Sequence, residues 1–119
     1  MRARGQEIAF GFKRNLTGFK EVVPEAKNFV DLGLDPRTFD FGERILDEMG
    51  KAGRIHFDLS GMRMLNCLDG VLKGASELNP VGSTNWELRT IWDDPILRRK
   101  TTFYRDGLNI STEEVRRLP

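Results

Sequence analysis

Two short segments decide the fold of this chain: residues 54–59, RIHFDL, and residues 100–105, KTTFYR. The first alternates polar and apolar residues strictly, which is the pattern of a half-buried β-strand. Its open face would carry three polar side chains, those of Arg54, His56 and Asp58. The second is rich in β-branched and aromatic residues, which favour strands. The sequence therefore predicts two strands, each with one polar row of side chains.

Helices and a hairpin are expected around these two strands. Apolar spacing, capping residues and glycine stops predict helices over four further segments: residues 41–49, 60–72, 84–93 and 111–116. A loop is expected from Gly74 to Gly82, and Asp106-Gly107 should turn the second strand back into residues 108–110. Residues 1–30 contain three glycines that disfavour a long helix, so this segment is expected to be partly flexible, with a short helix over residues 25–32.

These elements predict an α+β domain: N-terminal helices followed by a small twisted antiparallel sheet with a helical insertion. The length of 119 residues is that of one domain, spanning residues 1–119, with 39% hydrophobic residues to form its core. No apolar run approaches the roughly 20 residues that cross a bilayer. The sequence thus favours a single globular unit without a membrane-spanning segment.

Residue usage excludes several kinds of site. Cys67 is the only cysteine and His56 the only histidine, so no disulfide within the chain and no ordinary zinc site is expected. Cys67 is expected to be a small core residue rather than a nucleophile. The net charge is +1, without the basic balance that marks many nucleic-acid binders. We predict no metal and no cofactor.

His56 is the first candidate for catalysis. Histidine is the side chain whose ordinary pKa lies nearest neutrality, so it is the natural general acid or base. On the expected strand it shares a face with Asp58, which could orient the imidazole, and with Arg54, which could bind substrate. The alternative is that a surface strand tolerates any polar residue at this position.

The second strand offers a complementary row. Lys100, Thr102 and Tyr104 would project from one face and supply an ammonium, a hydroxyl and a phenol to a phosphate. Arg98 and Arg99 precede that row, and their guanidinium groups suit bidentate contact with phosphate oxygens. Beside His56, this row would complete a metal-free ribonuclease site. The alternative is a threonine-rich edge strand protected by charges against aggregation.

Three further residues have weaker indications. An exposed Trp86 could stack on a base, although packing in the core is the simpler interpretation. Glu87 and Glu43 are the helical carboxylates that a glycosidic-bond enzyme acting on a nucleotide such as NAD would need.

Another hypothesis is that the chain is a non-enzymatic interaction module, in which the acidic middle and the basic ends dock to a partner.

Four segments resemble a known group of proteins: residues 31–37, 54–59, 84–89 and 101–107, the last two forming an ELR…TTFYRDG arrangement. They look like C-terminal toxin modules of bacterial polymorphic and contact-dependent growth inhibition systems. Many such modules have the barnase/EndoU/colicin/RelE-like fold and cleave tRNA or other RNA. The resemblance implies a metal-independent nuclease, exported as part of a larger effector and acting in the cytoplasm of the target cell. It also implies a cognate immunity protein and, for some relatives, help from a translation elongation factor.

The leading hypothesis is therefore an RNase toxin, acting on tRNA by general acid/base transphosphorylation. Catalytic roles are expected for five residues: His56, Asp58, Lys100, Thr102 and Tyr104. Substrate binding is expected from Arg54, Arg98, Arg99 and Trp86. The alternatives are an NAD-consuming or ADP-ribosylating toxin and the interaction module.

Overall fold

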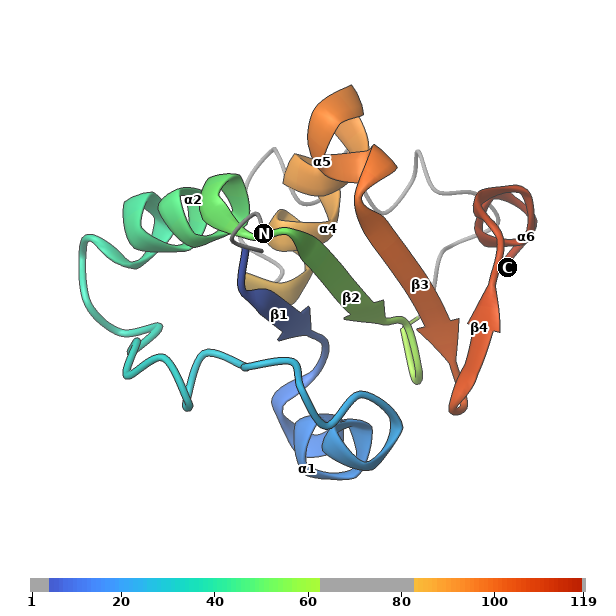
Figure 1. Cartoon of the computed structure of the whole chain (residues 1–119), viewed down its shortest axis with the longest axis horizontal. Coiled ribbons are helices and arrows are strands. Elements are labelled where there is room, and N and C mark those ends of the chain that lie inside the picture. Colours follow the sequence, from blue (N-terminus) through green and yellow to red (C-terminus); the bar gives the residue numbers. More distant parts are fainter. Residues whose placement is uncertain (1–4, 63–82, 119) are drawn as a thin grey trace, which may run out of the picture.

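A four-stranded mixed sheet forms the centre of the computed structural model, which describes residues 5–62 and 83–118 (Figure 1). The strands follow one another across the sheet in chain order: β1 (Glu7–Phe10), β2 (Arg54–Asp58), β3 (Thr101–Arg105) and β4 (Leu108–Ile110). The first three run parallel, and β4 is antiparallel to β3. Five helices are described: α1 (Lys13–Val22), α2 (Phe41–Lys51), α4 (Ser83–Asp93), α5 (Pro95–Arg99) and α6 (Thr112–Arg116). The domain is α+β, as the sequence predicts.

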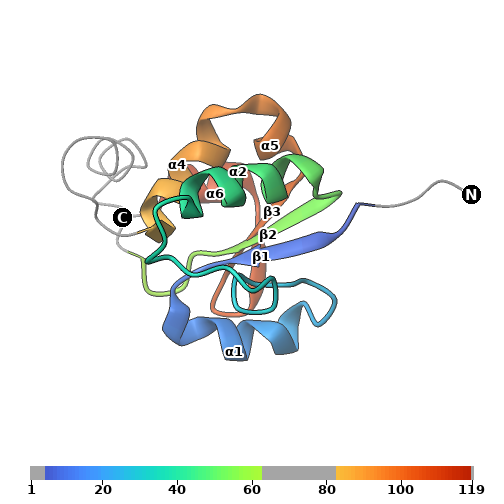
Figure 2. The same cartoon turned by 90° about the vertical axis from the view of Figure 1, so that its left-hand side faces the viewer.

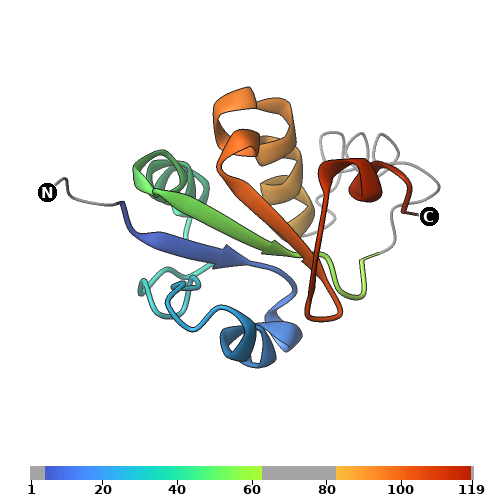
Figure 3. The same ribbon diagram turned by 45° about the vertical axis from the view of Figure 1, so that its right-hand side comes forward.

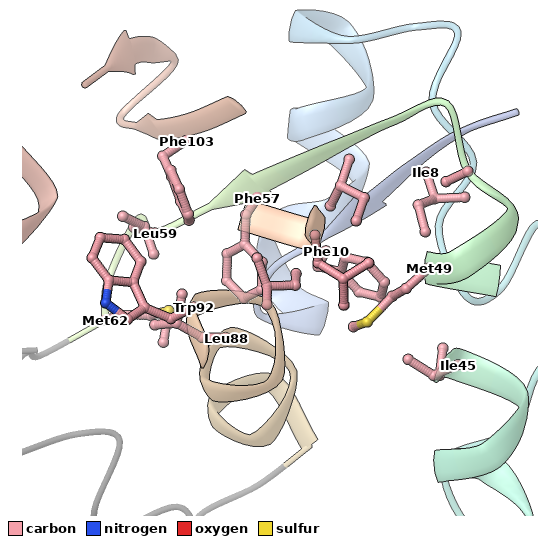
Figure 4. Packing of buried hydrophobic residues seen from close by; sticks show 14 of the residues in the cluster. Ile8, Phe10, Ile45, Met49, Phe57, Leu59, Met62, Leu88, Trp92 and Phe103 are labelled. Atoms are coloured by element: carbon pink, nitrogen blue, oxygen red, sulfur yellow. The ribbon is translucent and has the colours of Figure 1, made fainter. Parts of the chain in front are cut away.

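The helices cover both faces of the sheet. Figure 2 shows α1 on one side of the strands and α2, α4, α5 and α6 on the other. The larger core lies on the α2 and α4 side, where alternate residues of β1, β2 and β3 point. Figure 4 shows Phe10, Phe57 and Phe103 of successive strands meeting Leu88 and Trp92 of α4. A smaller cluster joins α1 to the opposite face through Leu16, Phe19, Val23, Ala26 and Ala9.

Local signals set several element ends, although α5 is not among the predicted helices. The Asp94 side chain accepts from the backbone N–H of Ile96 and begins α5, with Pro95 at its first position. Ser111 and Glu114 form the expected capping box of α6. Gly107, with a φ of 82°, turns β3 into β4. Figure 3 shows this hairpin and its continuation into α6.

The expected antiparallel sheet after N-terminal helices is wrong. The chain opens with β1, and β1, β2 and β3 pair in parallel. The physical reason lies in the connections: the segments between these strands contain helices, and a helical crossover returns the chain to the same end of the sheet. The predicted strands at residues 54–59 and 100–105 are neighbours, but they run in the same direction. The finer comparison with a barnase/EndoU/colicin/RelE-like fold stays a proposal.

The interpretation of residues 1–30 also needs correction. Lys27 continues the sheet beside β1 through backbone hydrogen bonds with Ala9 and Glu7. The predicted helix over residues 25–32 is absent from this described stretch. The Asn28 side chain there accepts from the backbone N–H groups of Val30 and Asp31 and forms a turn instead. The predicted helix over residues 60–72 beyond Met62, the loop up to Gly82, and Cys67 lie outside the described residues.

Truncating the centre of the larger core should destabilise the domain. We expect Phe57→Ala to lower the free energy of unfolding by about 3–5 kcal/mol, because Phe57 has no exposed surface and packs on β1, β3 and α4. Urea denaturation measures the change. Phe39→Ala is the matched control, since Phe39 is fully exposed and its loss should leave the midpoint unchanged. Equal effects of the two substitutions would contradict this description of the core.

Candidate functional site

His56 lies on the central strand β2 and points to the face that α1 covers. Its exposed fraction is only 6% and that of Asp58 is 5%, so the expected open face of this strand is buried except at Arg54. The alternation of polar and apolar residues is confirmed, but α1 packs over the polar side. A histidine in this position needs hydrogen-bond partners inside the protein.

Both ring nitrogens of His56 have such partners. Nε2 lies 2.7 Å from Oε1 of Glu7 on β1, and Nδ1 lies 2.8 Å from the phenol oxygen of Tyr104 on β3. In the strand register His56 faces Ala9 and Thr102, so Glu7 and Tyr104 flank it on a diagonal across three strands. The result is a continuous chain of ionisable groups, Glu7–His56–Tyr104.

The Tyr104 end of this chain is partly desolvated. The ring packs edge-on against Phe19 of α1, with 5.2 Å between centroids. Burial raises the pKa of the phenol above its usual value, the nearby Arg54 guanidinium opposes this, and the Glu7 and Glu25 carboxylates add to it. Tyr104 therefore stays protonated at neutral pH and can donate its O–H.

The Glu7 end of the chain reaches solvent beside a cation. The Glu7 side chain is 37% exposed, and its register partner across the sheet is Arg54. Arg54 is exposed and donates from Nη1 to Thr102 Oγ1 at 3.0 Å. A guanidinium carries further N–H donors, so Arg54 can also contact a bound anion. Acid, base and cation are thus assembled from three neighbouring strands.

Two of the expected site residues are engaged elsewhere. The Asp58 carboxylate accepts from the backbone N–H of Ser60 at 3.0 Å and from its hydroxyl, which fixes the turn after β2. The carboxylate that contacts the imidazole is Glu7, not Asp58 as the sequence suggested. Lys100 donates from Nζ to the carbonyls of Ala52 and Gly50, at 2.6 and 3.3 Å, and burial lowers its pKa. It holds the end of α2 rather than joining the row of Thr102 and Tyr104.

The expected substrate-binding residues other than Arg54 belong to the helices on the opposite side of the sheet. Arg98 of α5 donates to the carbonyl of Trp92 at 2.9 Å and lies over its ring. Arg99 of the same helix is exposed. Trp86 of α4 is partly buried against the larger core. The structure therefore does not bring these three side chains to the Glu7–His56–Tyr104 chain.

Sequence reasoning missed Glu7. The segment Glu7–Phe10 is only four residues long, does not alternate between polar and apolar residues, and is followed by Gly11, so it gives no clear indication of a strand. Only parallel pairing with β2 places Glu7 beside His56. The one available signal was the polar residue before Ile8, Ala9 and Phe10, which is weak evidence by itself.

A second candidate site surrounds Glu87, which lies on the buried face of α4. Glu87 is 5% exposed and lines a cavity of about 170 Å³ together with Lys13, Phe29, Phe41 and Thr84, among others. Burial raises the pKa of its carboxyl to about 8, and no charged or hydrogen-bonding neighbour within residues 5–62 and 83–118 opposes the shift. The carboxyl is therefore mostly protonated at pH 7. Of the two helical glutamates considered for nucleotide chemistry, Glu43 is exposed and Glu87 is buried.

Two kinds of feature are absent from the described residues. Within that part of the chain, no three His, Cys, Asp or Glu side chains are grouped to hold a metal ion. None of the helices there is long and apolar enough to span a membrane.

No protein-family model matches the chain, and neither a curated protein nor a solved structure shows significant similarity to it.

The buried Glu87 carboxyl should make stability depend on pH. The folded protein keeps a proton up to about pH 8 that the unfolded chain releases near pH 4.5. Stability from this group is therefore lost as pH rises between those values, by about 1 kcal/mol for each pH unit. We expect Glu87→Gln, measured by urea denaturation from pH 5 to 9, to remove this loss.

Glu43→Gln is the matched control, because Glu43 is exposed on α2 and its substitution should leave the pH dependence of wild type unchanged. If wild type and Glu87→Gln lose stability in parallel between pH 5 and 8, the Glu87 carboxyl is not desolvated in the folded protein.

Proposed function

We propose that this chain is a metal-independent ribonuclease whose chemistry is performed by the Glu7–His56–Tyr104 chain. The observation that carries the proposal is the double hydrogen bonding of His56, to a half-exposed carboxylate at 2.7 Å and to a phenol at 2.8 Å, beside the exposed Arg54. A base, an acid and a cation are the groups that transphosphorylation of RNA requires.

With His56 as imidazolium, Nε2–H donates to Glu7 and Nδ1–H donates to the Tyr104 oxygen, which leaves the Tyr104 O–H free for substrate. The Glu7 carboxylate takes the proton of the ribose 2′-hydroxyl, and the 2′-oxygen bonds to phosphorus. The bond from phosphorus to the 5′-oxygen breaks, and that oxygen takes the Tyr104 proton.

The enzyme is then restored. Tyr104 recovers a proton from Nδ1 of His56, and the neutral imidazole regains one as Glu7 returns the 2′-hydroxyl proton through solvent. The products are a 2′,3′-cyclic phosphate and a 5′-hydroxyl. Arg54 stabilises the charge on the phosphorane oxygens, and Thr102 holds Arg54 in place at 3.0 Å. Glu7 and Tyr104 touch the substrate, and His56 positions them and carries protons between them.

The resemblance of four segments to bacterial toxin modules supports a more specific proposal. The substrate would be tRNA, and the domain would be delivered in a larger exported effector to the cytoplasm of a competing cell. A cognate immunity protein would then cover the exposed Glu7 and Arg54 side chains and block access to His56. Recruitment by a translation elongation factor would compensate for the net charge of only +1.

The Glu87 cavity favours one alternative activity. Enzymes that consume NAD or transfer ADP-ribose need a glutamate in a pocket, and Glu87 lines one, with a pKa perturbed by burial. Loss of NAD with intact tRNA in expressing cells, abolished by Glu87→Gln, would support this activity over the ribonuclease.

Substitution of His56 tests the ribonuclease directly. Purified protein incubated with total tRNA and EDTA should produce 2′,3′-cyclic phosphate ends, and His56→Ala should slow cleavage by about 100-fold or more. Tyr104→Phe should cause a comparable loss, because it removes the donated proton but keeps the ring against Phe19.

Lys100→Met and Lys51→Met are the matched controls for charge. Lys100 is bound to backbone carbonyls and Lys51 to Asp47 and Glu48, so neither should change the cleavage rate of folded protein appreciably. Cleavage by His56→Ala at the wild-type rate would remove the Glu7–His56–Tyr104 chain from the mechanism.

Toxicity separates an enzyme from an interaction module. Expression of the chain in bacterial cytoplasm without an inhibitor should stop growth, and His56→Ala should restore it at equal protein level. Normal growth of cells that accumulate folded wild-type protein would contradict the toxin proposal.

A further inference from the structure

The Glu87 cavity lies apart from the ribonuclease groups and is built from five parts of the chain. Its walls come from the end of β1, the start of α1, the connection that holds Phe29 and Pro36, the start of α2, and the first turns of α4. None of Glu7, His56 and Tyr104 lines it. An inference about this cavity is therefore independent of the proposed ribonuclease chemistry.

The size and walls of the cavity suit one flat ring. Its volume is about 170 Å³, and an apolar cavity of about 150 Å³ is large enough to hold benzene. Phe10, Phe29 and Phe41 supply aromatic carbon to its walls. Such walls favour an aromatic ligand, which can stack on or pack edge-on against the rings.

The acidic group in this cavity is the Glu87 carboxyl, whose pKa is raised by burial. A polar group that lines a cavity is available to a ligand. A protonated carboxyl presents one O–H donor beside one C=O acceptor. It pairs with a ring edge that carries an acceptor next to an N–H donor.

A cation marks the route out of the cavity. Lys13 is exposed and lines both this cavity and a wider surface groove of about 570 Å³. Phe29 and Pro36 also line both, so the two spaces adjoin. Lys13 and Glu87 are the ionisable side chains that line the cavity. The lining residues from α2 and β1 are apolar: Phe41, Ala9 and Phe10. A ring beside Glu87 could thus continue into a sugar, with its phosphate near Lys13.

We propose that the Glu87 cavity binds the six-membered heteroaromatic ring of a nucleotide, with the ring edge paired to Glu87 and the phosphate near Lys13. A pyrimidine base and a nicotinamide both offer an N–H donor beside an acceptor on a single ring. A purine carries a second fused ring, so it fits the space between the phenylalanine rings less closely than a single ring does.

Calorimetric titration of the whole chain with cytidine 5′-monophosphate tests the site, since this base keeps one protonation state between pH 7 and 9. Wild type should bind at pH 7 and weaken about tenfold at pH 9, as Glu87 ionises. Glu87→Gln keeps a donor beside an acceptor and should bind at both pH values. Glu87→Leu should weaken binding about tenfold or more. Glu43→Gln is the control and should behave as wild type.

Titrations with other ligands identify the kind of nucleotide that the cavity binds. Tighter binding of nicotinamide mononucleotide than of the cytidine nucleotide would support the site and identify a nicotinamide nucleotide as its ligand. Adenosine 5′-monophosphate should bind more weakly than both. If Glu87→Leu fails to fold, the comparison of wild type with Glu87→Gln at pH 9 carries the test. The proposal is overturned if neither single-ring nucleotide binds at millimolar concentration, or if inorganic phosphate binds as tightly as they do.

Discussion

The burial of β2 on both faces and along both edges is the constraint on which the rest of the structure depends. β2 pairs in parallel with β1 and with β3, the larger core covers one face, and α1 covers the other. Beyond the exposed Arg54 at its start, the polar side chains of this strand cannot reach water freely and need partners within the protein. His56 is hydrogen-bonded to Glu7 and Tyr104, and the Asp58 carboxylate accepts from Ser60.

This constraint explains why, in the proposed mechanism, the imidazole acts through its neighbours. A histidine with both ring nitrogens hydrogen-bonded has a fixed orientation. The His56 ring is buried, whereas the side chain of its partner Glu7 reaches solvent. The same hydrogen bonds bind three strands together, so removal of His56 affects both chemistry and packing. For this reason Tyr104→Phe, which leaves the ring packing in place, separates the two effects more cleanly than removal of the imidazole.

Periodicity and capping predicted the elements whose signals are local. The strands β2, β3 and β4 and the helices α2, α4 and α6 lie where spacing and capping residues indicate them. The direction of the strands was not predictable in this way, because alternating polar residues in β2 are typical of a half-exposed antiparallel strand. The polar face is buried here only because Glu7 and Tyr104 satisfy it. Tyr104 does contact His56, and Thr102 lies beside it in the strand register and binds Arg54. Lys100 and Asp58 instead make local hydrogen bonds that no spacing rule describes.

Glu7 and Glu87 show how one residue type acquires opposite properties in one small domain. Glu7 is half-exposed at a sheet edge, beside His56 and Arg54, where a carboxylate can accept a proton from substrate. Glu87 is enclosed among aromatic rings, where desolvation favours the neutral acid. A charged carboxylate suits proton abstraction, and a neutral one suits recognition of a ring edge. Because the two groups require opposite environments, their separation, with Glu7 on β1 and Glu87 on α4, is what would allow one chain to support both proposed roles.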